Sequence, residues 1–112
     1  MNDLIDKKCV PCEAGVLPFD IGEIHKYQKK VDGWDVKKNE NNNYFLEKKF
    51  TFQNFINSQE FINKVGKISE EEGHHPDIFF GWGYAKISII THAIEGLSEN
   101  DFILAAKIDL IN

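Results

Sequence analysis

Five side chains suited to proton transfer or metal binding, three carboxylates and two imidazoles, lie close together in the stretch EEEGHHP. Glu70 precedes the adjacent histidines His74 and His75, and Pro76 follows them directly. In a continuous helix, residues four positions apart share a face, so we expect Glu70 to lie beside His74. A residue before proline is pushed toward extended geometry. The two imidazoles could therefore line one pocket from different directions.

A third histidine, His92, stands at the end of a second apolar segment. The segments 77–84 and 85–92 predict two strands, and a hairpin would return its far end close to its start. His92 would then lie near His74 and His75. An imidazole can donate or accept a proton near neutral pH, and a neighbouring carboxylate fixes its tautomer. The cluster predicts a proton-transfer site.

Other interpretations of these residues stay open. A single histidine at the C-terminus of a helix usually caps that helix. The same cluster could also ligate zinc or iron, although the chain has no HExxH motif and no histidine pair at i and i+4. Cys9 and Cys12 have the CxxC spacing of a redox pair or of half a zinc site, but no second CxxC and no βαβ pattern follow.

Composition limits the classes of function. The chain has 112 residues, of which 42% are hydrophobic and 28% charged, and this predicts one globular domain. Its net charge is −5 and every basic residue is lysine, so we expect no direct nucleic-acid binding. No apolar run approaches the roughly 18 residues of a membrane span, and the N-terminus lacks the apolar stretch of a signal peptide. We expect a cytoplasmic protein that does not bind membranes.

The elements that must position the cluster follow from periodicity and turn residues. Residues 1–17 predict an extended arm, and residues 18–112 predict a single domain. The order of patterns is α-β-β-α-β-β-α. It predicts an α+β fold in which a four-stranded antiparallel sheet carries three helices on one face. The helices are expected at 21–31, 53–72 and 99–111, and the strands at 34–38, 44–52, 77–84 and 85–92.

Taken together, these motifs resemble the pterin-4a-carbinolamine dehydratase family. The matching pieces are Glu70, His74-His75-Pro76, Thr91-His92, Gly96-Leu97-Ser98, Asp101-Phe102, Gly33-Trp34 and the run 50–55. CVPCEAG is similar to the arm found in one branch of the family. The resemblance covers nearly the whole chain.

The resemblance implies a function. It implies a hydro-lyase that dehydrates 4a-hydroxytetrahydrobiopterin to the quinonoid dihydropterin and so recycles the cofactor of aromatic amino-acid hydroxylases. It implies a small-molecule pterin substrate, no metal or organic cofactor, and a homodimer or homotetramer. Two rival functions are a regulatory dimerisation module, since animal members of the family also assist a homeodomain transcription factor, and a role in molybdopterin metabolism.

The resemblance also assigns site residues. His74, His75 and His92 carry over as catalytic. We expect the first two to transfer protons, His92 to orient the pterin, and Glu70 to orient His74. The expected substrate-binding residues are Glu70, Gly73, Pro76, Thr91 and Asp101. Gly73 stands where many members carry a polar or acidic residue, and the segment 81–84 departs from the usual strand.

Overall fold

The computed structural model describes residues 3–11 and 16–112. Its elements follow the predicted order and confirm the α+β fold. The helices are α1 (Ile21–Gln28), α2 (Phe55–Glu72) and α3 (Glu99–Leu110), with two short 3-10 turns, η1 (Asp3–Asp6) and η2 (His92–Ile94). The strands are β1 (Asp35–Lys38), β2 (Tyr44–Thr51), β3 (Asp77–Gly81) and β4 (Tyr84–Ile89).

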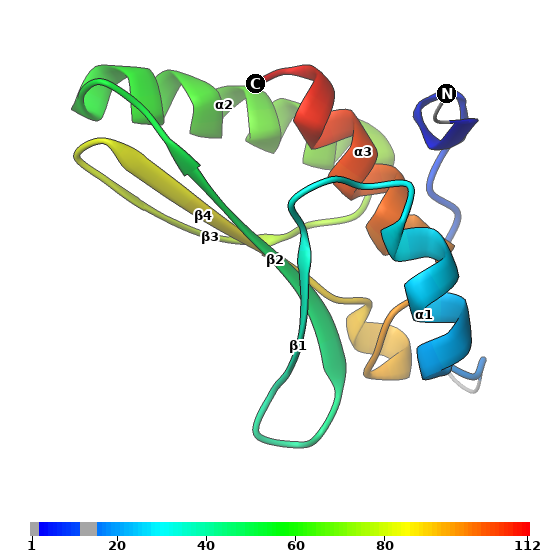
Figure 1. Cartoon of the computed structure of the whole chain (residues 1–112). Coiled ribbons are helices and arrows are strands. Elements are labelled where there is room, and N and C mark those ends of the chain that lie inside the picture. The colour runs from blue at the N-terminus through cyan, green and yellow to red at the C-terminus, as the bar shows by residue number, and fades with distance from the viewer. Residues whose placement is uncertain (1–2, 12–15) are drawn as a thin grey trace.

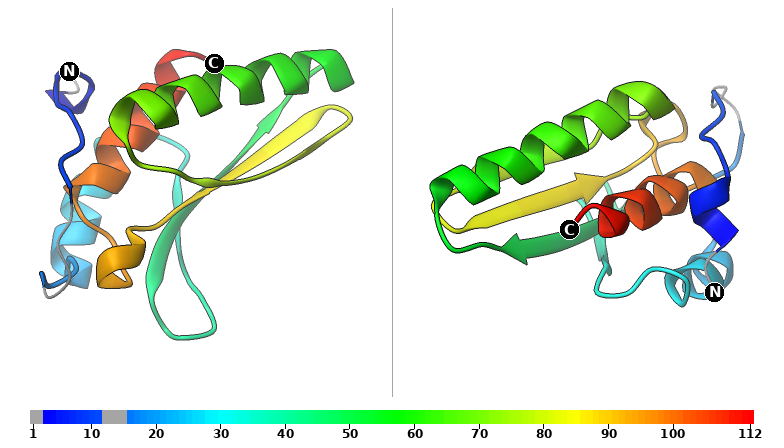
Figure 2. Two further views of the ribbon diagram at one scale, coloured as in Figure 1. Left: turned by 180° about the vertical axis from the view of Figure 1, so that it is seen from behind. Right: turned by 90° about the horizontal axis from the view of Figure 1, so that it is seen from above.

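The sheet is antiparallel throughout, with the strand order β1-β2-β4-β3. Figures 1 and 2 show the helices on one side of it, with α2 running along β3 and β4 and α1 lying beside α3. The register places Leu46 of β2 opposite Ile89 of β4, and both are fully buried. Their side chains face the helices, because alternate residues of a strand point to opposite sides of the sheet.

The core joins this sheet face to the two longer helices. Phe61 and Val65 of α2 and Phe102 and Leu104 of α3 are buried against the strands. Helix α3 is buried on nearly all sides, since residues 100–106 are all buried. A helix that is enclosed in this way holds its N-terminus at a fixed position relative to the sheet.

Helix α2 stops where the sequence predicts, at Gly73. This glycine adopts the left-handed conformation with φ of 64°, which side chains with a Cβ rarely adopt. Its N–H bonds back to the helix, and the N–H of His74 donates to the carbonyl of Ser69 at 3.2 Å. The chain therefore turns sharply away from the helix directly before the two histidines.

Three predicted strand boundaries were wrong, and the helix predicted at 21–31 ends at Gln28. The chain reverses at Trp82 and Gly83, where Gly83 has a φ of 79°, so β3 ends and β4 begins earlier than predicted. Strand β4 ends at Ile89, and His92 begins η2 instead of ending a strand. The alternation of apolar residues continues through this segment and conceals the end of the strand.

The N-terminal arm is not simply extended. Residues Asp3–Asp6 form η1, and Leu4 is fully buried in the core. The following residues run along α3 toward the C-terminal end of α2, as their hydrogen bonds to both helices show. Among the described residues no helix is both long and apolar enough to cross a membrane. The cytoplasmic location stays a prediction.

Candidate active site

An open pocket of about 250 Å³ brings the predicted histidines together. His74 and His75 enter it from the turn after α2, and His92 enters it from η2. The long-range contact expected from the β3–β4 hairpin therefore exists, although β4 is shorter than predicted. Gly73 and Thr91 also line the pocket, whereas Glu70, Pro76 and Asp101 are not among its lining residues.

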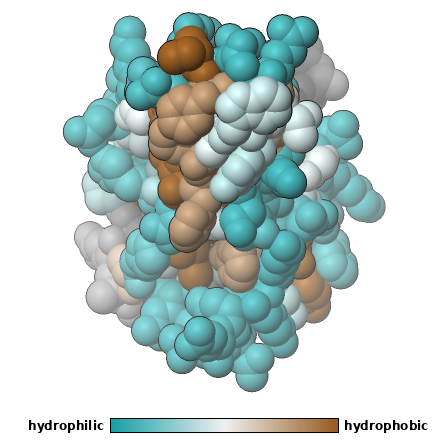
Figure 3. All heavy atoms as spheres, turned by 90° about the vertical axis from the view of Figure 1, so that its left-hand side faces the viewer, coloured by the Kyte–Doolittle hydropathy of each residue, from teal (hydrophilic) through white to brown (hydrophobic). Residues whose placement is uncertain are grey.

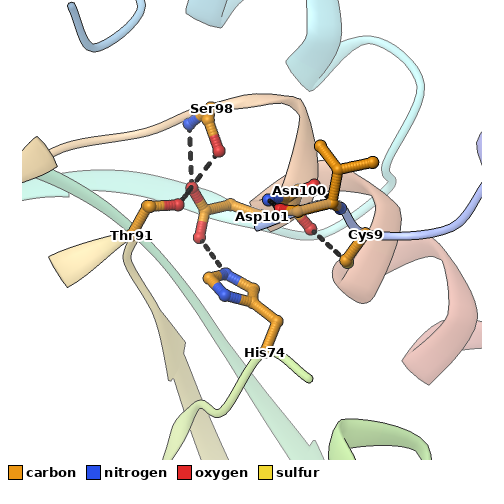
Figure 4. A network of polar contacts seen from close by, with 7 residues as sticks. Cys9, His74, Thr91, Ser98, Asn100 and Asp101 are labelled. Carbon is orange, nitrogen blue, oxygen red and sulfur yellow. Dashed lines mark hydrogen bonds and ion pairs between the residues drawn. The ribbon is translucent and has the colours of Figure 1, made fainter. Parts of the chain in front are cut away.

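The ring of His74 is held by a buried carboxylate. Its Nε2 lies 2.7 Å from Oδ1 of Asp101, whose side chain is fully buried, and the His74 side chain itself is only 13% exposed. The other oxygen of Asp101 accepts hydrogen bonds from the Thr91 hydroxyl at 2.7 Å and from the Ser98 N–H at 2.8 Å. Figure 4 shows the carboxylate surrounded by these donors.

This arrangement selects one tautomer of His74. An ionised aspartate accepts hydrogen bonds and has none to donate, so Nε2 of His74 carries the proton. A neutral His74 then keeps its lone pair on Nδ1. Asp101 occupies the third position of α3 and closes a capping box with Ser98, so the helix N-terminus itself fixes the carboxylate. We expected Asp101 to bind substrate, and its bond to His74 was not predicted from the sequence.

Glu70 pairs with His75 and not with His74. The expectation of a Glu70–His74 contact was wrong because the left-handed turn at Gly73 ends the helix, and the four-residue helical spacing does not extend to His74. His75 and Glu70 are 60% and 77% exposed at their side chains. An ion pair so open to solvent contributes little to stability, on the order of 0–1 kcal/mol.

Five further pocket residues were not predicted from the sequence, and two of them, Ile90 and Ala93, flank the predicted Thr91 and His92. Val10 and Pro11 reach the pocket from the N-terminal arm, and Asn100 reaches it from the first turn of α3. The CVPC motif and the family resemblance of the arm do not reveal that it reaches the pocket, because its place depends on contacts across about 90 residues of chain. Only the position of Asn100 next to Asp101 in the sequence could have indicated that Asn100 lies at the site.

The cysteine interpretations gain no support from the described residues. Burial, helped by the nearby charge of Glu72, raises the pKa of Cys9 to about 12. Since the thiolate is both the nucleophile and the metal ligand, Cys9 is poorly suited to either role. Cys12 lies outside the described residues. Within 3–11 and 16–112, no group of three or more His, Cys, Asp or Glu side chains is placed to hold a metal ion.

Comparison with known proteins decides the family. The family model described as "Pterin 4 alpha carbinolamine dehydratase" matches residues 18–111. The chain belongs to the pterin carbinolamine dehydratase family. It is 44% identical to a protein of Rubrobacter xylanophilus over 97% of this chain and 98% of that protein, and 46% identical to one of Halorhodospira halophila over 96% of both. Both relatives bear the name "Putative pterin-4-alpha-carbinolamine dehydratase".

A solved structure supports the same fold. The crystal structure of a "transcriptional coactivator/pterin dehydratase" from Brucella melitensis superimposes with a TM-score of 0.75 at 23% identity, covering 84% of this chain and 97% of that one. At this identity the likeness concerns the fold alone. The predicted family is confirmed, and a dehydratase of this family is a hydro-lyase.

The tautomer of His74 can be measured directly. We expect neutral His74 to carry its proton on Nε2 in ¹⁵N-labelled protein, as read from imidazole nitrogen shifts. Asp101→Asn replaces one carboxylate oxygen with an NH₂ group, which then faces one of the three donors from His74, Thr91 and Ser98. The change should lower the free energy of unfolding by about 1–3 kcal/mol, and it should remove the tautomer preference of His74. Asp109→Asn alters a carboxylate on the same helix that binds Trp34 and Lys48, and it should leave the His74 signals unchanged. A dominant Nδ1–H tautomer in the wild type would contradict the assignment.

Proposed function

We propose that this chain dehydrates 4a-hydroxytetrahydropterins to quinonoid dihydropterins in tetrahydropterin recycling. The observation that carries the proposal is the pocket on which three histidines converge, one of them fixed by a buried carboxylate. Membership of the pterin carbinolamine dehydratase family supports the substrate class. The proposal rests on the site as well as on the fold, because one fold can serve several functions.

The reaction requires two proton transfers. An acid protonates the hydroxyl that leaves the carbinolamine carbon as water, and a base takes the proton from the neighbouring ring nitrogen as the C=N bond forms. Positioned imidazoles can perform both, each contributing on the order of 10²–10⁴-fold. We assign the transfers to His74 and His75 and the orientation of the pterin to His92.

The environments of the two histidines suit different tasks. His74 is almost enclosed, and its bond to Asp101 leaves Nδ1 as the acceptor, which suits a base. His75 is exposed beside the Glu70 carboxylate, and it is the remaining candidate for the acid. In this scheme Glu70 and Asp101 are positioning residues that act through the histidines.

The rival functions have no observation of this chain behind them. The Brucella melitensis structure carries "transcriptional coactivator" in its title, but its 23% identity to this chain shows only a shared fold. The intact set of three histidines on one pocket is what an enzyme requires and what a dimerisation module does not. The dehydratase proposal therefore has the stronger support.

A stopped-flow dehydration assay on synthetic 4a-hydroxytetrahydropterin tests the proposal. We expect the wild type to accelerate dehydration well above the buffer rate, equally with and without a chelator. His75→Ala should lower the rate constant by roughly 10²-fold or more, since it removes one proton-transfer group. His25→Ala removes an exposed imidazole of α1 and serves as the matched control, with no change expected. Full activity of His75→Ala would refute its assignment, and an inactive wild type would refute the function.

We further propose that the chain is a homo-oligomer. Exposed apolar side chains gather where the β3–β4 turn meets the start of α2, on the face shown in Figure 3. They include Phe55, Ile56, Phe80 and Trp82, and the rings of Phe55 and Phe80 lie 5.5 Å apart. Phe79, whose side chain points to the opposite face of β3, is also exposed. Strand β3 is one of the two edge strands of the sheet, and an unpaired apolar edge can pair with another copy of the chain.

Light scattering after size-exclusion chromatography tests the oligomer. We expect the wild type to be a dimer or tetramer, and Phe79→Lys to shift it toward the monomer because it places a charge on the β3 surface. Leu110→Lys is the matched control, since Leu110 on α3 is 64% exposed and Phe79 is 62% exposed. A wild type that stays monomeric at every concentration would contradict the proposal.

A further inference from the structure

The N-terminal arm supplies part of the wall of the histidine pocket. Val10 and Pro11 line it beside His74, His75 and His92. Neither arm residue carries an ionisable side chain, and proline has no N–H to donate. The arm can therefore offer the pocket apolar contact but no proton donor or acceptor from these side chains.

The side-chain amide of Asn100 pairs with the arm at Val10. The N–H of Val10 donates to Oδ1 of Asn100 at 3.0 Å, and Nδ2 of Asn100 donates back to the carbonyl of Val10 at 2.5 Å. Asn100 is buried at the first turn of α3, next to Asp101. Its amide thus pairs with the Val10 backbone in both directions, as one strand pairs with another. Figure 4 shows Asn100 beside the carboxylate that holds His74.

A second anchor lies one residue earlier. The N–H of Cys9 donates to Glu72 at 2.8 Å, and Lys107 donates to the other oxygen of that carboxylate at 2.7 Å. Burial works to raise the pKa of Glu72, but the hydrogen bonds from Lys107 and Cys9 outweigh it and hold the pKa below its ordinary value. The Glu72 side chain is 6% exposed, so this anchor is built into the C-terminal end of α2.

We propose that these two anchors make the arm a substrate-binding element. Asn100 is the positioning residue, and it holds Val10 and Pro11 against the apolar part of the bound pterin. The inference rests on the proposed function and deepens it. Because the arm offers no proton-transfer group, it binds the ground state and the transition state alike. Its loss should raise KM and leave kcat unchanged.

Val10→Pro is the sharpest test. It deletes the N–H that donates to Oδ1 of Asn100, and it keeps an apolar side chain. It leaves α3 and the Asp101 carboxylate unchanged. We expect KM for the 4a-hydroxytetrahydropterin to rise about fivefold, as the loss of one hydrogen bond predicts, with kcat unchanged. Asp3→Ala is the control. Asp3 lies earlier in the arm, where it forms an exposed ion pair with Lys30, and its loss should change neither KM nor kcat.

A double variant separates positioning from direct contact with substrate. If Asn100 acts through Val10, then Asn100→Ala combined with Val10→Pro should raise KM no further than either change alone. Three results would each overturn the inference. They are increases in KM that multiply in the double variant, an unchanged KM in Val10→Pro, and a kcat that falls while KM rises. The activity of the wild type is measured before that of any variant. An inactive wild type would refute the proposed function and, with it, the role of the arm.

Hydrogen exchange gives a readout that does not depend on the folding of Asn100→Ala. Binding of 7,8-dihydropterin to the wild type should slow exchange in the peptide that contains Val10. The Asp3→Ala protein should show the same protection, whereas Val10→Pro should show weaker binding of the same probe. Unchanged exchange at saturating probe would contradict contact between the arm and the ligand.

Discussion

The site depends on one buried carboxylate. Asp101 is fully enclosed, and a charge in that position is tolerated only when hydrogen bonds replace the water it has lost. Its donors come from three separate segments: the imidazole of His74 after α2, the hydroxyl of Thr91 after β4, and the N–H of Ser98 at the start of α3. The same bonds that stabilise the charge therefore bring the walls of the pocket together.

The three histidines of the pocket differ in burial. His74 is enclosed and has one fixed partner, whereas His75 and His92 are exposed on the same pocket. In the proposed mechanism the enclosed imidazole, whose tautomer is fixed, accepts a proton at a defined place, and the exposed imidazoles serve as the acid and as the group that orients the pterin. Val10 and Pro11 of the arm and Asn100 of α3 line the same pocket.

Local patterns in the sequence predicted most of the fold and the identity of the histidines, but not their partners. The end of α2 at Gly73 and the cap at Ser98 are local, and both were found where turn residues marked them. The partner of His74 was missed because helical spacing favoured Glu70, while the true partner lies 27 residues away. The arm was predicted as a segment, but its contacts with α3 were missed for the same reason, since they are long-range.

The central claim is that Asp101 acts through His74, and a double-mutant cycle on single-turnover dehydration tests it most directly. The rate constants of His74→Ala, Asp101→Asn and the double variant would be compared with that of the wild type. The account predicts that the double variant is as slow as His74→Ala alone, within about twofold, because no ring remains for the carboxylate to position. Losses that multiply in the double variant would contradict it.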